Sequence, residues 1–430
     1  MAAHTTDAEL GRVLLTHRGI QWIIGTKDDP YALLLRCASD DPHELGSLIR
    51  QRGPLYLSSA EAWVTAHHDI GAAALDASAL DPRPTPADTA STDDPHRRRM
   101  PWEIPTLREI LPVEAAFRPL GRADYERLLP LADPVLGTAA LCERQETVRG
   151  IHSEVVAAAG GEPDLLHDIA HRAAVRVVAT LLEVPDEAEF ARLCRAATGT
   201  LDATLCPPHL RDAPGLLSSV GALRDLTAAR VTAGAGIAGR LREALASAGE
   251  TDEAAVAVGT LLAVPGVELS ANLVANAVAA LLATPDQWTS LVEQPELAEA
   301  AVEETLRHSP PVRLQPLFAT ADVELAGVTV PAGAQVVVAI EAANRDPEIY
   351  PDAWRFDVSR FAGSGSVAAP LGLRGTPDLA LIAPLVRLQA VSALQVIATE
   401  LPQLRPVGTA PARLRSPMTR GHLRFPVIAR

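Results

Sequence analysis

The chain has 430 residues, a formal net charge of −15, and a composition that is 48% hydrophobic but only 3% aromatic. The acidic balance argues against a nucleic-acid or anionic-membrane partner, because both select basic surfaces. With few aromatic side chains, Ala, Leu and Val must fill the core, and this favours a mainly α-helical protein.

Residues 1–28 predict an amphipathic N-terminal segment in front of a single domain that spans residues 29–430. From Ala8 to Ile24 apolar side chains recur at helical spacing. Packing of this helix on its own domain is one interpretation. The other is a partner-binding face, for which the predicted residues are Leu10, Val13, Leu14, Ile20 and Trp22.

Residues 81–112 contain several prolines and the run His96–Met100, a composition that predicts an irregular connection within the domain. After this connection, helical patterns continue to about Ala321. The chain therefore has one helix-rich domain rather than two domains joined by a linker.

One apolar run, residues 254–283, is long enough to raise the question of a membrane span. Pro265, Glu268 and Asn272 fall near its middle. A charge at the centre of a spanning helix costs about 3 kcal/mol on insertion scales. We therefore expect a buried central helix and no membrane partner.

Residues 322–340 change from helical to alternating spacing, with turns at Gly327 and at Pro331–Gly333. The apolar residues that predict short strands here are Val323, Leu325, Val328, Val330, Val336, Val338 and Ile340. Helices, a small sheet and a last long helix describe an α-rich α+β fold.

Metal and disulfide patterns are absent from the sequence. Cys37, Cys142, Cys194 and Cys206 have no motif spacing, and no signal peptide is recognisable, so we expect a reducing cytoplasm. His167 and His171 stand four residues apart in HDIAH, but no third metal ligand can be named. We predict no metal site.

The segment EETLRHSPPVR (303–313) places Glu304 and Arg307 on one helix face before two prolines, and a turn-rich stretch with Arg355 follows. In order and spacing this resembles the cytochrome P-450 superfamily. The resemblance implies that fold, and it implies a charge-paired triad of Glu304, Arg307 and Arg355 beside the heme loop. Residues 265–272 resemble the family's central helix, and residues 383–390 resemble the helix after its heme ligand.

The residues that serve heme chemistry are missing from this resemblance. Ala380 stands at the position of the family's axial cysteine, and residues 361–385 contain no Cys, His, Met or Tyr. Glu268 is followed by Leu269 where the family has an acid–alcohol pair that relays protons. Tyr125 and Leu129 stand where it commonly has a histidine and an arginine. We therefore expect no heme and no other cofactor.

A small subfamily shares this character, namely the heme-free, cytochrome P-450-like auxiliary proteins that partner deoxysugar glycosyltransferases in macrolide and anthracycline biosynthesis. The segment Leu10–Arg36 is also similar to theirs. The resemblance implies a non-enzymatic activator that forms a hetero-oligomer with a deoxysugar glycosyltransferase, in the narrower form an aminosugar transferase of polyketide antibiotic biosynthesis.

Two alternatives stay open. In one, the chain is a heme-free enzyme or ligand-binding protein that uses the remnant substrate cavity, with Glu268 as acid or base. In the other, heme is kept by a distant ligand such as His308 or His422.

Overall fold

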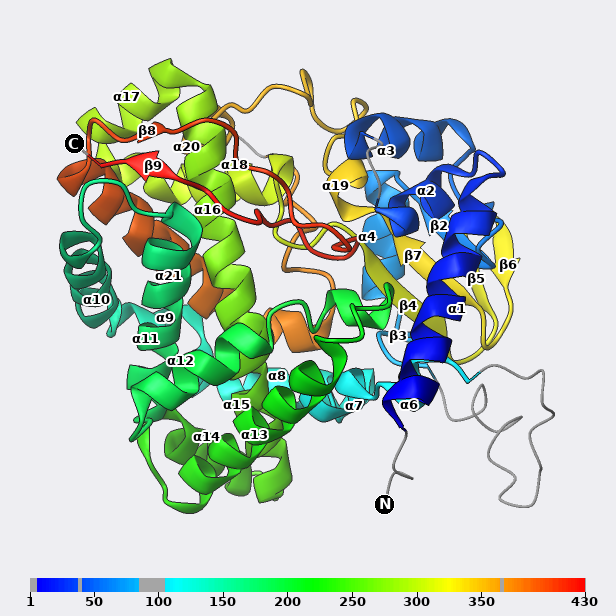
Figure 1. The fold of residues 1–430 in the computed structure, drawn as a ribbon, viewed down its shortest axis with the longest axis horizontal. Coiled ribbons are helices and arrows are strands. Elements are labelled where there is room, and N and C mark those ends of the chain that lie inside the picture. Colours follow the sequence, from blue (N-terminus) through cyan, green and yellow to red (C-terminus); the bar gives the residue numbers. More distant parts are fainter. Residues whose placement is uncertain (1–5, 38–40, 85–104, 364–366, 430) are drawn as a thin grey trace.

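The computed structural model describes residues 6–37, 41–84, 105–363 and 367–429. Most of the predicted irregular connection, residues 85–104, lies outside the described residues. Figure 1 shows a helix-rich body with a small sheet at one side and the long helix α16 through its middle. The predicted mainly helical, α-rich α+β architecture is confirmed.

Four helices precede or interrupt the first strands: α1 (Asp7–Gly25), α2 (Pro30–Arg36), α3 (Pro42–Gln51) and α4 (His68–Asp76). The middle of the chain forms α6 (Leu107–Ile110), α7 (Val113–Phe117), α8 (Arg122–Leu136), α9 (Thr138–Cys142), α10 (Gln145–Ala158), η1 (Leu165–His171), α11 (Arg172–Leu182), α12 (Glu187–Ala196), η2 (Asp202–Thr204), α13 (Ala213–Thr232), α14 (Gly236–Ala246) and α15 (Asp252–Leu261). The later helices are η3 (Leu262–Gly266), α16 (Val267–Ala283), α17 (Pro285–Glu293), η4 (Pro295–Leu297), α18 (Ala298–His308), α19 (Ile340–Ala343), α20 (Ser359–Ala362) and α21 (Pro377–Glu400).

The main sheet has the strand order β1-β2-β7-β4-β3. Its strands are β1 (Tyr56–Leu57), β2 (Ala62–Thr65), β3 (Leu80–Asp81), β4 (Gln315–Ala319) and β7 (Gln335–Val338). Strands β2 and β7 pair in parallel, and the other neighbours are antiparallel. Two further pairs are β5 (Val323–Leu325) with β6 (Val328–Val330), and β8 (Arg405–Pro406) with β9 (Val427–Ile428).

The strands predicted in residues 322–340 are confirmed as β5, β6 and β7. The turns between them need residues that accept a left-handed backbone, and Gly327 and Gly333 have φ angles of 75° and 85°. Ile340 lies outside β7, at the start of α19.

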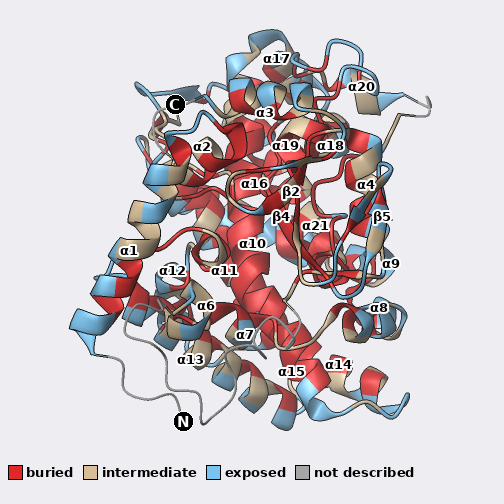
Figure 2. Cartoon of the chain, turned by 90° about the vertical axis from the view of Figure 1, so that its right-hand side faces the viewer, coloured by how far each residue is buried: buried red, intermediate tan, exposed pale blue. Residues whose placement is uncertain are grey.

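The predicted central helix is confirmed as a continuous run of α15, η3 and α16 that Figure 2 shows as a buried column. Pro265 lies in the π-helical turn η3, where the irregular hydrogen bonding accommodates a residue without an N–H. Residues 252–283 and 377–400 are long and apolar enough to cross a membrane by length and composition, and 100% and 67% of their apolar windows are buried in the protein. Packing in the core accounts for this hydrophobicity.

The inner face of α1 is covered by the chain itself. Leu10, Val13 and Leu14 are 8%, 2% and 3% exposed. The residues that Leu10 and Leu14 pack against in one cluster are Leu111, Val113, Ala203, Ala213 and Leu216. The prediction that Leu10, Val13 and Leu14 face a partner is therefore wrong, because their apolar surface is already used within the chain.

The opposite side of α1 is not covered. Of the predicted partner-binding residues, Ile20 and Trp22 remain 40% and 47% exposed, and Leu15 and Ile23 beside them are 74% and 67% exposed. The helix is therefore apolar on two sides, and its inner side explains why it lies on the domain.

Candidate functional site

The segment before α21 is the place where the resemblance implies a heme ligand. Residues 367–376 form a loop that runs into α21, with Pro377 at the first helical position. A Cβ at Gly372 would lie 3.0 Å from the Leu306 carbonyl oxygen, and one at Gly375 would lie 3.2 Å from Leu75 Cδ2. The two glycines therefore let this loop pack tightly against the chain's own core.

The residues around this loop do not fit a heme. Residues 361–385 offer none of the side chains that hold heme iron. A porphyrin-sized cavity would leave its lining residues with accessible surface, yet Leu269 on α16 is 0% exposed, and Leu373, Leu379 and Ile382 are 1%, 1% and 0% exposed. These four side chains belong to one hydrophobic cluster. The space between α16 and the start of α21 is thus filled by side chains.

Asp378, two residues before Ala380, forms a buried ion pair with Arg118. Arg118 Nε is 2.6 Å from Asp378 Oδ2, and the two side chains are 1% and 0% exposed. Glu114 Oε1 lies 3.4 Å from Arg118 Nη1. Burial by itself would lower the pKa of Arg118, but Asp378 and Glu114 raise it on balance. Burial and the nearby Asp378 raise the pKa of Tyr125, which stays a neutral phenol. The first turn of α21 is therefore held by an ion pair between two side chains of the chain itself.

Glu304 and Arg307 form a buried pair on α18. Glu304 Oε2 accepts from Arg307 Nε at 2.7 Å and Glu304 Oε1 accepts from Arg307 Nη2 at 2.6 Å, with both side chains 0% exposed. Arg307 also donates to the carbonyl oxygens of Asn344, Ala353 and Arg355. The pair thus joins α18 to the turn-rich segment that follows α19.

The prediction for the third member of this network is wrong. The Arg355 side chain is 70% exposed and lies 4.0 Å from Asp357, and only its backbone carbonyl reaches Arg307. Arg360 takes the predicted place, because its Nε lies 3.5 Å from Glu304 Oε2 and its side chain is 13% exposed. Arg355 lies in a turn and Arg360 in the short helix α20, and neither element is long enough for the sequence to show which side chain turns inward.

Glu268, the candidate acid or base on α16, is held by two groups. Arg413 Nη2 donates to its Oε1 at 2.6 Å, and the Gly199 N–H lies 3.1 Å from each of its oxygens. Burial raises the pKa of Glu268, while Arg413 opposes this shift. On balance the pKa of Glu268 is raised, but its Oε1 is occupied by Arg413, whose charge favours the ionised form.

Asp202 anchors the C-terminal hairpin, which we define as residues 411–423. Its Oδ1 accepts from the N–H groups of Met418 and Thr419, each at 2.9 Å. Its Oδ2 accepts from Ser416 Oγ at 2.8 Å, Thr419 Oγ1 at 2.7 Å and Arg413 Nη2 at 3.0 Å. Asp202 and Glu268 therefore share Arg413, and this arginine joins η2, α16 and the hairpin.

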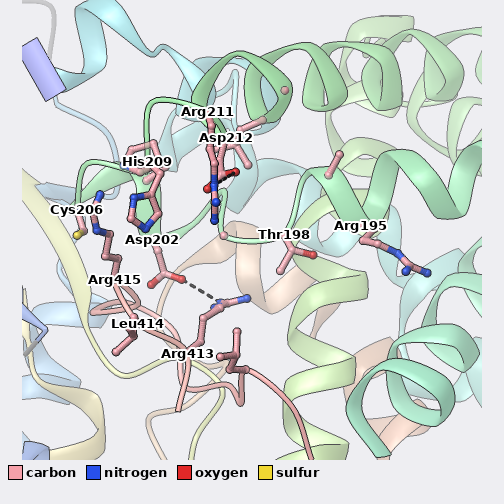
Figure 3. A pocket seen from close by; sticks show the side chains of 17 residues that line it. Arg195, Thr198, Asp202, Cys206, His209, Arg211, Asp212, Arg413, Leu414 and Arg415 are labelled. Carbon is pink, nitrogen blue, oxygen red and sulfur yellow. Dashed lines mark hydrogen bonds and ion pairs between the residues drawn. The ribbon is translucent and has the colours of Figure 1, made fainter. Parts of the chain in front are cut away.

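A cavity of about 600 Å³ opens beside this anchor, and we call it the arginine recess (Figure 3). Its lining residues include Arg195, Asp202, Arg211, Asp212, Arg413, Leu414, Arg415 and Leu423. A smaller cavity of about 180 Å³ shares Arg195, Thr198, Arg413 and Leu423 with it and reaches Glu268 and Asn272 on α16. Of these two cavities, the smaller one is lined by residues of the central helix.

The histidines named as distant heme ligands have other partners. His308 Nδ1 contacts Ser309 Oγ at 2.9 Å and His308 Nε2 contacts the Trp354 carbonyl at 3.1 Å. His422 Nδ1 lies 3.3 Å from the Ala410 carbonyl. Among the described residues, no group of three His, Cys, Asp or Glu side chains could hold a metal ion.

Comparisons with known proteins agree with this fold. Residues 284–367 match the cytochrome P-450 family model. Protein AknT of Streptomyces galilaeus is 42% identical over 98% of this chain and 96% of its own length. Protein DesVIII of Streptomyces venezuelae is 35% identical over 98% and 94%. The cytochrome P-450 family protein EryCII of Saccharopolyspora erythraea is 30% identical over 98% and 99%.

Solved structures also have folds similar to that of this chain. The crystal structure of Mycobacterium smegmatis CYP164A2 with econazole bound has a TM-score of 0.75 and 26% identity, covering 92% of this chain and 98% of the other. CalO2 has a TM-score of 0.73 and 25% identity, with coverage of 91% and 96%. On these similarities, the chain belongs to the cytochrome P-450 family.

Proposed function

We propose that this protein is a non-catalytic partner of a deoxysugar glycosyltransferase, which it binds, stabilises and activates in the cytoplasm of an antibiotic-producing bacterium. The observation that carries the proposal is the packed, ion-paired core at the family's heme position. A fold that keeps its buried Glu304–Arg307 pair but has no donor for iron serves through its surface. The full-length similarity to AknT, DesVIII and EryCII adds support.

In this proposal α1 supplies part of the contact through its exposed side, which includes Ile20 and Trp22 of the predicted set but not Leu10, Val13 and Leu14. Leu15, Trp22 and Ile23 are exposed on its outer side, and Arg36 lies 4.9 Å over the Trp22 ring. Exposed apolar side chains on the outer side of a helix whose inner side is already packed mark a candidate interaction surface. Aromatic and aliphatic anchors of this kind dominate many interfaces, and truncating one costs about 1–4 kcal/mol.

Co-expression tests the proposal. A partner that binds only the native enzyme stabilises it by about 3–4 kcal/mol at concentrations of 100–1,000 times the dissociation constant. We expect the cognate glycosyltransferase to be more soluble and more active with this chain than without it. Equal solubility and equal sugar transfer in both conditions would refute the proposal.

The alternative, an enzyme or ligand-binding protein that uses Glu268, has less support. Its acid is paired with Arg413, and the three histidines of the smaller cavity are occupied or buried. His167 Nε2 and His422 Nδ1 contact backbone carbonyls at 3.0 Å and 3.3 Å, and burial lowers the pKa of His171 to about 4. Turnover of a polyketide by the purified protein alone, lost in Glu268→Gln, would establish this alternative instead.

A further inference from the structure

The arginine recess lies next to α1, because its lining residue Cys206 accepts a hydrogen bond from Arg18 of that helix at 3.5 Å. A Cβ at Gly11 would lie 3.0 Å from Leu210 Cδ2, so Leu210 packs on α1 directly. Ala203 and Leu216 line the recess on one side and pack on Leu10 and Leu14 of α1 on the other. The recess therefore adjoins the inner side of α1, the helix whose outer side is exposed.

The charge of the recess is opposite to that of the chain. Arg195, Arg211, Arg413 and Arg415 line it together with two aspartates, Asp202 and Asp212, whereas the whole chain carries −15. Figure 3 shows Arg211 and Arg413 approaching the same space from opposite sides, one from the segment before α13 and one from the C-terminal hairpin. Asp202 is already saturated by donors from the hairpin. Arg413 is paired with Asp202, and Arg211 Nε lies 3.4 Å from Asp212 Oδ1. The four arginines still outnumber the two aspartates of the lining, so the recess carries a net positive charge toward an outside group.

The rim of the recess is apolar. Leu414 and Leu423 line it and are 71% and 55% exposed, and Leu210, between two lining residues, is 41% exposed. A small oxyanion would pair with the arginines but would leave these leucines in water. Exposed apolar groups that ring a charged hollow are typical of protein contacts, in which arginine and large apolar anchors carry most of the binding energy.

The floor of the recess favours an occupant that enters from the surface. Arg413 is fixed between Asp202 and Glu268, with its Nη2 at 3.0 Å and 2.6 Å from their oxygens. This bridge lies between the recess and α16. The recess therefore has a fixed floor against which a protruding group from the surface can be received.

We infer that the arginine recess is a docking site for an acidic segment of the partner protein, with carboxylates between Arg211 and Arg415 and an apolar side chain against Leu414 and Leu423. This inference rests on the proposed function for the identity of the partner. A second copy of this chain fits less well, because it would bring together two molecules of net charge −15.

The main experiment compares two double variants of the full chain. Arg211→Glu with Leu414→Asp alters the recess at side chains that are 83% and 71% exposed, so the fold should be unchanged. Arg149→Glu with Leu57→Asp is the matched control, with exposures of 55% and 58% at places outside the recess. Affinity for the purified cognate glycosyltransferase is measured by titration calorimetry, and melting temperatures check that both variants are folded.

We expect the recess variant to bind at least ten-fold more weakly and the control to bind within two-fold of the unaltered protein. The affinity of the unaltered protein should also fall with added salt more steeply than that of the recess variant, since one charge pair is gone. Equal affinity of the two double variants would overturn the inference and leave the proposed function standing. If the unaltered protein does not bind the glycosyltransferase, both proposals fail.

A cross-linking experiment identifies the occupant. With p-benzoylphenylalanine in place of Leu414, illumination of the complex should attach an acidic peptide of the glycosyltransferase, and the same group in place of Leu57 should not. A cross-link to a second copy of this chain, or tight binding of inorganic phosphate that is lost in Arg211→Glu, would refute the inference.

Discussion

Removal of the Glu304 carboxylate should destabilise the protein more than any surface charge change. Glu304 is 0% exposed and accepts from Arg307 at 2.6 and 2.7 Å and from the Asp357 N–H at 2.8 Å. In Glu304→Ala, Arg307 and that N–H are left buried without these acceptors. Breaking a buried pair in this way costs about 3–5 kcal/mol. With an unfolding entropy of about 2.1 cal/mol/K per residue, such a loss lowers the melting temperature of a 430-residue chain by about 3–6 °C.

The neighbouring residue provides the control for this prediction. Glu303 also pairs with an arginine, Arg387, at 2.6 Å, but the two side chains are 31% and 34% exposed. Glu303→Ala should cost about 0–1 kcal/mol, because solvent screens the pair. Differential scanning calorimetry of the two variants decides the matter. If Glu304→Ala melts within 1 °C of Glu303→Ala, burial of the Glu304–Arg307 pair does not stabilise this fold.

Four further outcomes follow from the same structure. Arg360→Ala should lower the melting temperature, whereas Arg355→Ala should not, because only Arg360 reaches Glu304 with its side chain. A loss of stability in Arg355→Ala but not in Arg360→Ala would instead support Arg355 as the third member of the network. Ala380→Cys, expressed with a heme precursor, should show no stoichiometric Soret band. In Asp202→Ala, trypsin should cleave the C-terminal hairpin at least ten-fold faster, as that hairpin loses five hydrogen-bond acceptor contacts among the described residues; an unchanged rate would contradict the anchoring role. Burial lowers the pKa of His152 to about 4, below the unfolded value of about 6.5, so between these values the unfolded state binds a proton that the folded state does not. The free energy of unfolding should therefore fall by about 1–2 kcal/mol from pH 6.5 to 5, and it should fall less in His152→Leu.

The sequence predicted the features that depend on local spacing. Glu304 and Arg307 are three residues apart on one helix, and the turns at Gly327 and Gly333 lie between alternating apolar residues, so neighbours in the chain are enough to place them. The assignment of Arg355 to this network failed because the turns and the short helix α20 in this segment have no period that shows which side chain points inward. Periodicity likewise did not distinguish the inner side of α1 from its outer side, since both are apolar.

The contacts that define the candidate site are the ones that sequence reasoning missed. Asp202 and Arg413 are 211 residues apart, and Arg118 and Asp378 also come from distant elements. Each is a common residue type with no motif around it, so only the folded chain brings the partners together. One weak signal existed, because Asp378 is an acid at the start of an otherwise apolar helix, but an acid in the first turn is usually explained by the helix dipole.

The packed core at the family's heme position has an energetic reason. An unfilled cavity costs about 24 cal/mol for each Å³, so even a void of about 300 Å³ would cost about 7 kcal/mol. This is comparable with the whole net stability of a typical domain, about 5–15 kcal/mol. A chain of this family that gives up the cofactor must therefore refill the space, and here Leu269, Leu373, Leu379 and Ile382 do so while Asp378 pairs with Arg118. Under the proposed function the refilled fold acts through its surface, and the exposed side of α1 and the arginine recess are two parts of that surface with exposed apolar groups where a partner would bind.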